Sequence, residues 1–162
     1  MSAEVRSALE TDLDALMQLC KVVQARHVAL YPGDFKPALD PSALRAYFAE
    51  RLTSPTNAIG IAEADGVVVG YVSFDVQARP ATTFSLPRSR IYVHQIVVAP
   101  AARRRGIATA LMRHVEQRAV AEGIDEIALN TWADNPDAQR FFPSQGFTVF
   151  NVMLRKTLAS GG

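Results

Sequence analysis

The chain has 162 residues, a length typical of one domain, and its 49% hydrophobic and 20% charged residues are a globular composition. Its 17 Lys and Arg against 16 Asp and Glu leave a net charge of +1, which argues against a protein that coats nucleic acid. A single cysteine, Cys20, excludes an intramolecular disulfide and a multi-cysteine zinc site. Because the sequence has neither a long apolar run nor a signal-peptide pattern, we expect a cytoplasmic protein with no membrane partner.

Hydrophobic spacing and turn residues predict the element order β-α-α-β-β-β-α-β-α-β. Strands are expected at residues 4–9, 58–64, 67–76, 90–99, 124–131 and 147–158, and helices at 11–30, 41–52, 106–123 and 136–143. Thr11 is the expected N-cap of the first helix, Asp65-Gly66 a hairpin turn, 77–89 a connecting loop and Gly123 a C-cap. Three successive strands predict antiparallel pairing, and the crossover helix predicts a parallel step. The expected class is therefore a mixed α+β sheet flanked by helices, in one domain of about residues 3–158.

The most informative segment is residues 96–108, where a buried strand ends before Pro100 and a helix follows. Three consecutive arginines, Arg103 to Arg105, and then Gly106 precede that helix. The first backbone N–H groups of a helix have no partner within it and lie at the positive end of its dipole, so they can bind phosphate. Gly106 and the small Ala108 keep side-chain bulk away from such a ligand. The same arginines could instead only solvate the helix start.

Residues 103–108 (R-x-x-G-x-A) resemble the acyl-CoA pyrophosphate loop of the GNAT N-acyltransferase superfamily. Residues 135–142 (N-x-x-A-x-x-F-F), followed by Gly146-Phe147, are similar to a second block of that family, and Val5 to Leu13 is similar to its usual start. The resemblance implies an acetyl-CoA-dependent N-acetyltransferase with a GNAT-like fold. In such an enzyme the acetyl group passes directly to a primary amine in a ternary complex, without a metal.

The resemblance also implies where acetyl-CoA binds. The strand backbone at 96–98 would pair with the pantetheine arm, and the loop and helix start would hold the pyrophosphate. The strand that ends near Val98 and the next parallel strand would splay apart to admit the thioester. The implied binding residues are Ile96, Val97, Val98, Arg103, Arg104, Arg105, Gly106, Ile107, Ala108, Thr109, Asn135, Phe141 and Phe142.

His94 is the candidate general base, because the amine must lose a proton before it attacks and imidazole changes charge near neutral pH. Without a bulge, alternation places Tyr92, His94 and Ile96 on one face of their strand. A histidine that is only hydrogen-bonded beneath the sheet is the alternative. His27 is expected to line the substrate site or the surface, and His114 to lie exposed in mid-helix.

One position departs from the family pattern. Phe142 stands where many members have a tyrosine that protonates the leaving thiolate. Tyr92 or Ser144 could replace it, or the thiolate could leave unassisted, since a thiol titrates only slightly above neutral pH. This departure keeps open the alternative of a non-catalytic acyl-CoA-binding or sensing module.

The resemblance also implies that the acceptor site lies along the loop that follows the first helix. Tyr31, Asp34 and Phe35 could hold a cationic amine with an aromatic part, or could simply cap two helices. Trp132 could line the acceptor tunnel or be a core aromatic. Small-molecule and peptide amines both remain candidates, with no nucleic acid partner. The protein is expected as a monomer or homodimer, and a second subunit could complete the acceptor side.

Overall fold

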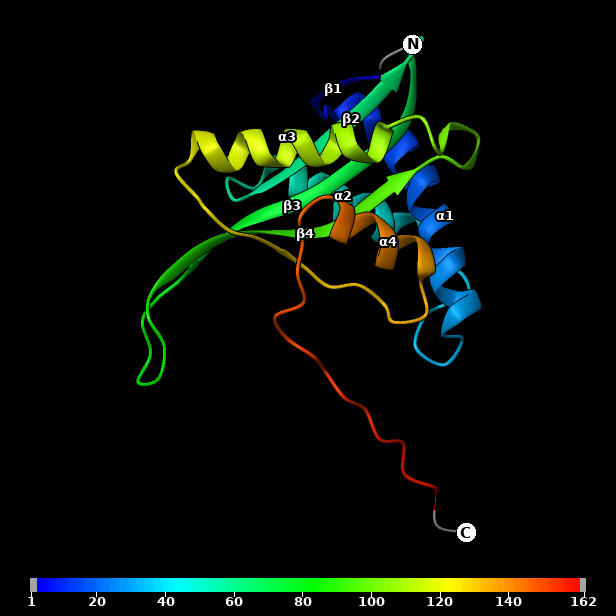
Figure 1. Ribbon diagram of the computed structural model, residues 1–162. Helices are drawn as coiled ribbons and strands as arrows, with labels where there is room; N and C mark the ends of the chain where they lie inside the picture. The colour runs from blue at the N-terminus through cyan, green and yellow to red at the C-terminus, as the bar shows by residue number, and fades with distance from the viewer. Residues whose placement is uncertain (1–2, 161–162) are drawn as a thin grey trace. The chain divides into compact units, whose positions relative to one another are not determined.

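A computed structural model describes residues 3–160, and its contacts divide the chain into one compact unit that ends at Asn130 and another that begins at Thr131. The first unit contains all the strands (Figure 1). They are β1 (Glu4–Ser7), β2 (Asn57–Ala64), β3 (Val67–Arg79), β4 (Arg88–Val98) and β5 (Ile127–Leu129). Its α-helices are α1 (Leu13–Leu30), α2 (Pro41–Thr53) and α3 (Ile107–Ala121), and the second unit contains α4 (Pro136–Ser144).

The strands form one mixed sheet in the order β1-β2-β3-β4-β5. The pairs from β1 to β4 are antiparallel, and β5 runs parallel to β4. α3 connects β4 to β5, as a parallel pair requires. The predicted class, a mixed and mostly antiparallel sheet flanked by helices, is confirmed.

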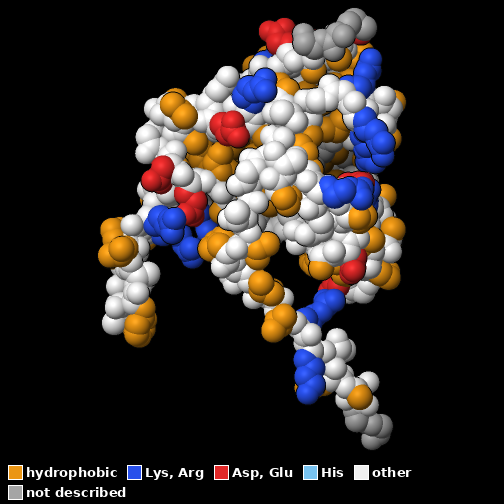
Figure 2. All heavy atoms as spheres, viewed as in Figure 1, with side chains coloured by type: hydrophobic (Ala, Val, Ile, Leu, Met, Phe, Trp, Pro, Cys, Tyr) orange, Lys and Arg blue, Asp and Glu red, His pale blue; other side chains and the backbone are white. Residues whose placement is uncertain are grey.

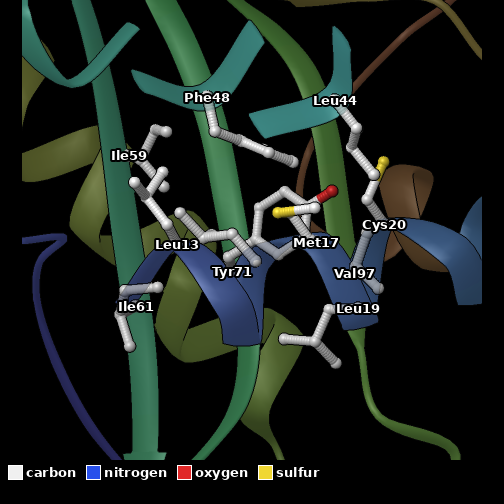
Figure 3. Packing of buried hydrophobic residues seen from close by; sticks show 11 residues of the cluster. Leu13, Met17, Leu19, Cys20, Leu44, Phe48, Ile59, Ile61, Tyr71 and Val97 are labelled. Atoms are coloured by element: carbon white, nitrogen blue, oxygen red, sulfur yellow. The ribbon is translucent and has the colours of Figure 1, made fainter. Parts of the chain in front are cut away.

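The helices of the first unit cover the two faces of the sheet, with α3 on one face and α1 and α2 on the other (Figure 1). On the α1–α2 face, side chains of both helices pack on Ile59, Ile61, Tyr71 and Val97 (Figure 3). On the α3 face, glycines in the strands allow the helix to lie close to the sheet. A Cβ at Gly70 would lie 2.7 Å from the carbonyl oxygen of Val97 and 3.4 Å from side-chain carbons of Ile107 and Leu111.

The turns and caps largely follow the local sequence. Asp65 and Gly66 both have positive φ, 53° and 75°, as the predicted β2–β3 hairpin turn requires. The C-cap of α3 is Glu122, and the predicted cap residue Gly123 comes one position later, with the positive φ of 66° at which glycine commonly ends a helix. Thr11 is not the N-cap of α1. It lies in a 3₁₀ turn, and the cap position belongs to Asp12, whose carboxylate accepts a hydrogen bond from the backbone of Leu9 at 2.7 Å.

The β3–β4 hairpin is longer than predicted. The expected loop at 77–89 shrinks to residues 80–87, because Arg79 and Arg88 still face each other as ladder partners. The added strand residues carry mostly exposed polar side chains, so a hydrophobicity pattern does not indicate that their backbone is paired. Phe84 and Leu86 in the connecting loop are 98% and 87% exposed.

Two predicted strands differ from the structure. The strand expected at 124–131 is only Ile127–Leu129, because its pairing with β4 ends there. The final strand expected at 147–158 is absent: residues 147–160 form no helix or strand, and the sheet contains only β1 to β5 within the described residues. A segment rich in apolar residues becomes a strand only when a neighbouring strand accepts its backbone hydrogen bonds. Within residues 3–160, no helix has the length and apolar character that a membrane crossing needs.

Candidate functional site

The pairing of β3 with β4 shifts by one residue at His94. Ser73 lies opposite Gln95, but the next residue, Phe74, lies opposite Val93. His94 is therefore the extra residue of a β-bulge, and β4 bends at this point.

Because of the bulge, the side chains of β4 do not alternate as predicted. Tyr92 pairs with Asp75, and the Nε2 atom of His94 lies 3.1 Å from the Oδ1 atom of the same Asp75. Ile96 instead lies opposite Val72, on the α3 face. The extra residue inverts the order of inward and outward side chains, so Tyr92 and His94 share a face that Ile96 does not.

One edge of β4 is left without a strand beyond the bulge. β5 pairs only with Ile91, Tyr92 and Val93. Among the described residues no strand pairs with residues 94–98 on that side. The predicted separation of the parallel pair is thus present in the strand pairing, and it leaves an edge without a strand partner, to which an extended amide chain can add as a further strand.

The loop after β4 has the conformation of an anion site. Gly106 is the N-cap of α3 with φ of 76°, and no side chain caps the helix there. Arg104 also has positive φ, 61°, and no described atom outside the adjoining residues lies within 4 Å of the position that a Gly106 Cβ would take. Because the first N–H groups of α3 have no acceptor within the helix, they can donate to a phosphate in this open space.

The three arginines of this loop are exposed, and Figure 2 shows Lys and Arg side chains at the side of the molecule where α3 begins. The Nε atom of Arg103 donates to the carbonyl oxygen of Val98 at 3.4 Å, which ties the loop to the end of β4. Arg105 lines a small recess with Asp65 of the β2–β3 turn. All three arginines thus lie in the loop directly before the start of α3.

His94 is the histidine whose surroundings fit proton transfer. Its side chain is 30% exposed, and its ring centroid lies 5.0 Å from that of Tyr92 in an edge-on arrangement. Sequence reasoning missed Asp75. The available signal was that Ser73, Asp75 and Gln77 occupy alternate positions of β3, but this pattern does not indicate the bulge that brings Asp75 to His94.

The other two histidines lie in more enclosed surroundings. His27 contacts the Phe35 ring at 4.7 Å between centroids, and burial, with the charge of Arg26, lowers its pKa. His114 is not exposed as predicted. It is half-buried because Gly60 leaves space for its ring, and burial lowers its pKa, with a smaller effect of Arg118.

The predicted acceptor loop is ordered between α1 and α2. The backbone N–H groups of Asp34 and Phe35 both donate to the carbonyl oxygen of Tyr31. Asp34 is exposed, whereas Tyr31 and Phe35 are partly buried. The loop thus carries one exposed carboxylate and two partly buried aromatic side chains.

The remaining predicted residues lie in the second unit. Asn135 is the N-cap of α4, and its Oδ1 accepts from the backbone of Ala138 at 3.4 Å. Phe142 is buried and contacts Phe141 edge-on, at 5.2 Å between centroids. The Ser144 hydroxyl donates to the carbonyl oxygen of Phe141 within the helix. Trp132 is 39% exposed.

Cys20 belongs to the core. Burial raises the pKa of its thiol, and hydrogen bonds with Tyr71 and Gln95 only partly oppose that effect. The Tyr71 hydroxyl donates to the Gln95 side chain at 2.7 Å, which fixes the residue after the bulge. A buried thiol of this kind is a poor nucleophile.

Comparison with known proteins extends these observations. The sequence model of the Acetyltransferase (GNAT) family matches residues 24–147. The L-amino acid N-acetyltransferase AaaT of Escherichia coli K12 is 32% identical over 102 residues, which are 62% of this chain and 59% of that protein. The BH1408 tetramutant from Bacillus halodurans is 20% identical with a TM-score of 0.88, covering 96% of this chain and 99% of that one. AAC(6')-Iy in complex with the bisubstrate analog CoA-S-monomethyl-acetylneamine is 23% identical with a TM-score of 0.73, over 98% and 100% of the two chains.

Proposed function

The chain belongs to the GNAT acetyltransferase family and is an acetyl-CoA-dependent transferase, and from this premise we propose that it acetylates the primary amine of a small molecule or peptide by direct transfer in a ternary complex. Residues 3–158 would act as one N-acetyltransferase domain. The observation that carries the proposal is the unpaired β4 edge, which begins at the His94 bulge and leads to the uncapped start of α3.

The described residues fit acetyl-CoA. The backbone of Ile96 to Val98 can pair with the amides of the pantetheine arm, because no strand of the described sheet occupies that edge. Gly106 to Thr109 offer backbone N–H groups to the pyrophosphate, and Arg103 to Arg105 offset its charge. The contacts predicted for Asn135, Phe141 and Phe142 stay predictions.

His94 is the proposed general base. An alkylamine is mostly protonated at neutral pH, so the ring must accept one proton before the nitrogen attacks the thioester carbonyl. The new C–N bond forms as the C–S bond breaks, and coenzyme A leaves as the thiolate. The nitrogen releases its second proton to water as the amide forms. Cys20 takes no part, since burial raises the pKa of its thiol.

No side chain at position 142 protonates the thiolate, because Phe142 has no exchangeable proton. Ser144 is a poor substitute, since its hydroxyl already donates within α4. Tyr92 lies next to His94 and stays the candidate acid. A thiol is acidic enough that departure of the thiolate to water is also possible at neutral pH.

The acceptor is proposed to be a polar, cationic primary amine. AaaT is named for L-amino acids, and the complex of AAC(6')-Iy contains an acetylneamine. Tyr31, Asp34 and Phe35 offer a carboxylate beside aromatic rings, a combination that suits an ammonium group. Trp132 stays a predicted lining residue.

A panel of amino acids, aminoglycosides, aryl-alkyl amines and peptides, each with acetyl-CoA, tests this function. We expect amine-dependent release of free thiol and an acetylated amine in the mass spectrum. A protein that binds acetyl-CoA but releases no thiol with any amine would instead be a binding or sensing module.

A further inference from the structure

Five side chains form a closed series of contacts on the hairpin of β3 and β4. Asp75 and Gln77 come from β3, whereas Arg90, Tyr92 and His94 come from β4. The Nε atom of Arg90 donates to Oε1 of Gln77 at 3.1 Å, and Nε2 of Gln77 donates to Oδ1 of Asp75 at 3.1 Å. His94 approaches the same Oδ1, and Tyr92 lies between the His94 ring and the Arg90 guanidinium, which is 5.3 Å from its centroid.

This arrangement determines which nitrogen of His94 carries a proton. A carboxylate only accepts hydrogen bonds, so the Nε2 atom of His94 that faces Asp75 Oδ1 is assigned as the donor. The other nitrogen, Nδ1, then has a free lone pair in the neutral ring. A carboxylate that orients an imidazole in this way also stabilises the imidazolium that forms on proton uptake.

Asp75 is itself held in place. Gln77 donates to the oxygen that faces His94, and Arg90 holds the Gln77 amide by its oxygen. The Asp75 side chain is only 20% exposed, so water competes little for it. The bulge makes the contact possible, because it brings His94 to the face of Asp75 while the strand continues.

We propose that Asp75 is a positioning residue for acetyl transfer, which holds His94 in the tautomer with Nδ1 free to take the proton of the amine. Gln77 is the residue that holds Asp75. The inference rests on the proposed function, since it assigns the partner of the proposed base.

A double-mutant cycle tests whether Asp75 acts through His94. We expect Asp75→Asn to lower kcat about 10-fold to 100-fold, while the KM for the amine and the Kd for acetyl-CoA stay unchanged. Asp75→Glu should restore part of the rate. In a His94→Ala background, Asp75→Asn should cause no further loss, because residues that act as one unit are not additive.

Glu126→Gln is the matched control. Glu126 is 21% exposed, close to the 20% of Asp75, and it pairs with Arg88 of β4 outside the series of contacts. This variant should retain full activity. Thermal unfolding of each variant separates a loss of positioning from a loss of folded protein.

Nitrogen-15 NMR of the histidine rings tests the tautomer without any turnover. The expected result is a neutral His94 protonated on Nε2 in the wild type and a mixture of tautomers in Asp75→Asn, with His27 and His114 unchanged as internal references. His94 protonated on Nδ1, or the same tautomer in Asp75→Asn, would overturn the inference.

The kinetic outcomes separate the inference from the function. If Asp75→Asn still lowers activity in the His94→Ala background and raises the KM of the amine, Asp75 binds the acceptor directly and the positioning role is wrong. Full activity of Asp75→Asn would also refute it. A wild type that transfers no acetyl group contradicts the proposed function instead, and the NMR result then decides the inference by itself.

Discussion

Replacement of Gly106 by alanine should weaken acetyl-CoA binding while the fold is retained. The residue has φ of 76°, a conformation that costs an L-residue with a Cβ about 1–2 kcal/mol. No described atom lies within 4 Å of the added Cβ, so the change introduces strain without a clash. The loop can relieve this strain by relaxing away from the conformation that binds the pyrophosphate.

The magnitude follows from that strain. If binding must restore the left-handed conformation, the cost of about 1–2 kcal/mol appears in the affinity as about a 5-fold to 30-fold higher Kd. Gly106→Asn should lose less, because asparagine tolerates positive φ better than alanine. The loss of affinity for acetyl-CoA should therefore be larger in Gly106→Ala than in Gly106→Asn.

Isothermal titration with acetyl-CoA measures the effect, and Gly123→Ala is its control. Gly123 ends the same helix with φ of 66° and equally open space around a new Cβ. Gly123→Ala should thus lower the unfolding free energy by about 1–2 kcal/mol with unchanged affinity. Wild-type affinity in Gly106→Ala, or an equal loss of affinity in both variants, would refute the assignment of the loop.

Three other changes test separate parts of the account. His94→Ala should lower kcat/KM by about 10²-fold to 10⁴-fold with strongly basic amines and less with weakly basic ones, in steady-state assays; a uniform loss would exclude His94 as the base. Gly60→Ala should destabilise the fold by about 1–3 kcal/mol in urea unfolding, because the added Cβ would lie 2.8 Å from the His114 ring. His114→Ala in the same chain should relieve most of that loss. If the two losses of stability simply add in the double variant, the predicted clash with His114 is wrong. The hydrogen bond from Arg6 lowers the pKa of Asp12. The ionised Asp12 therefore stabilises the fold above the ordinary carboxyl pKa of about 4, and this contribution is lost as the pH falls through the lower pKa of the folded state. Unfolding midpoints measured against pH should show this loss in the wild type and not in Asp12→Asn.

The fold was largely predictable because its signals are local. Asp65-Gly66 specifies a tight turn by itself, and the apolar spacing of α3 specifies the buried face of that helix. The order of elements then leaves few ways to pair the strands. Segments that depend on a distant partner were not predictable in the same way, and residues 147–158 are rich in apolar residues, as a strand would be, without forming one.

The candidate site was predictable where one segment carries it and not where two strands meet. Arg103 to Gly106 identify the anion loop from consecutive residues. The contact between Asp75 and His94 depends on the register of β3 against β4, and a one-residue shift changes the face of every later side chain. No local pattern indicated that bulge, so His94 was found as a candidate base but Asp75 was not.

Transfer of a radiolabelled acetyl group distinguishes direct transfer to the amine from transfer through an acetylated protein. The purified protein is mixed with labelled acetyl-CoA, first alone and then with an accepted amine, and protein and amine are separated after denaturation. We expect no label on the protein in either mixture and label in the amide of the acceptor in the second. Label that stays on the protein, or none in any amine, would contradict direct transfer from acetyl-CoA.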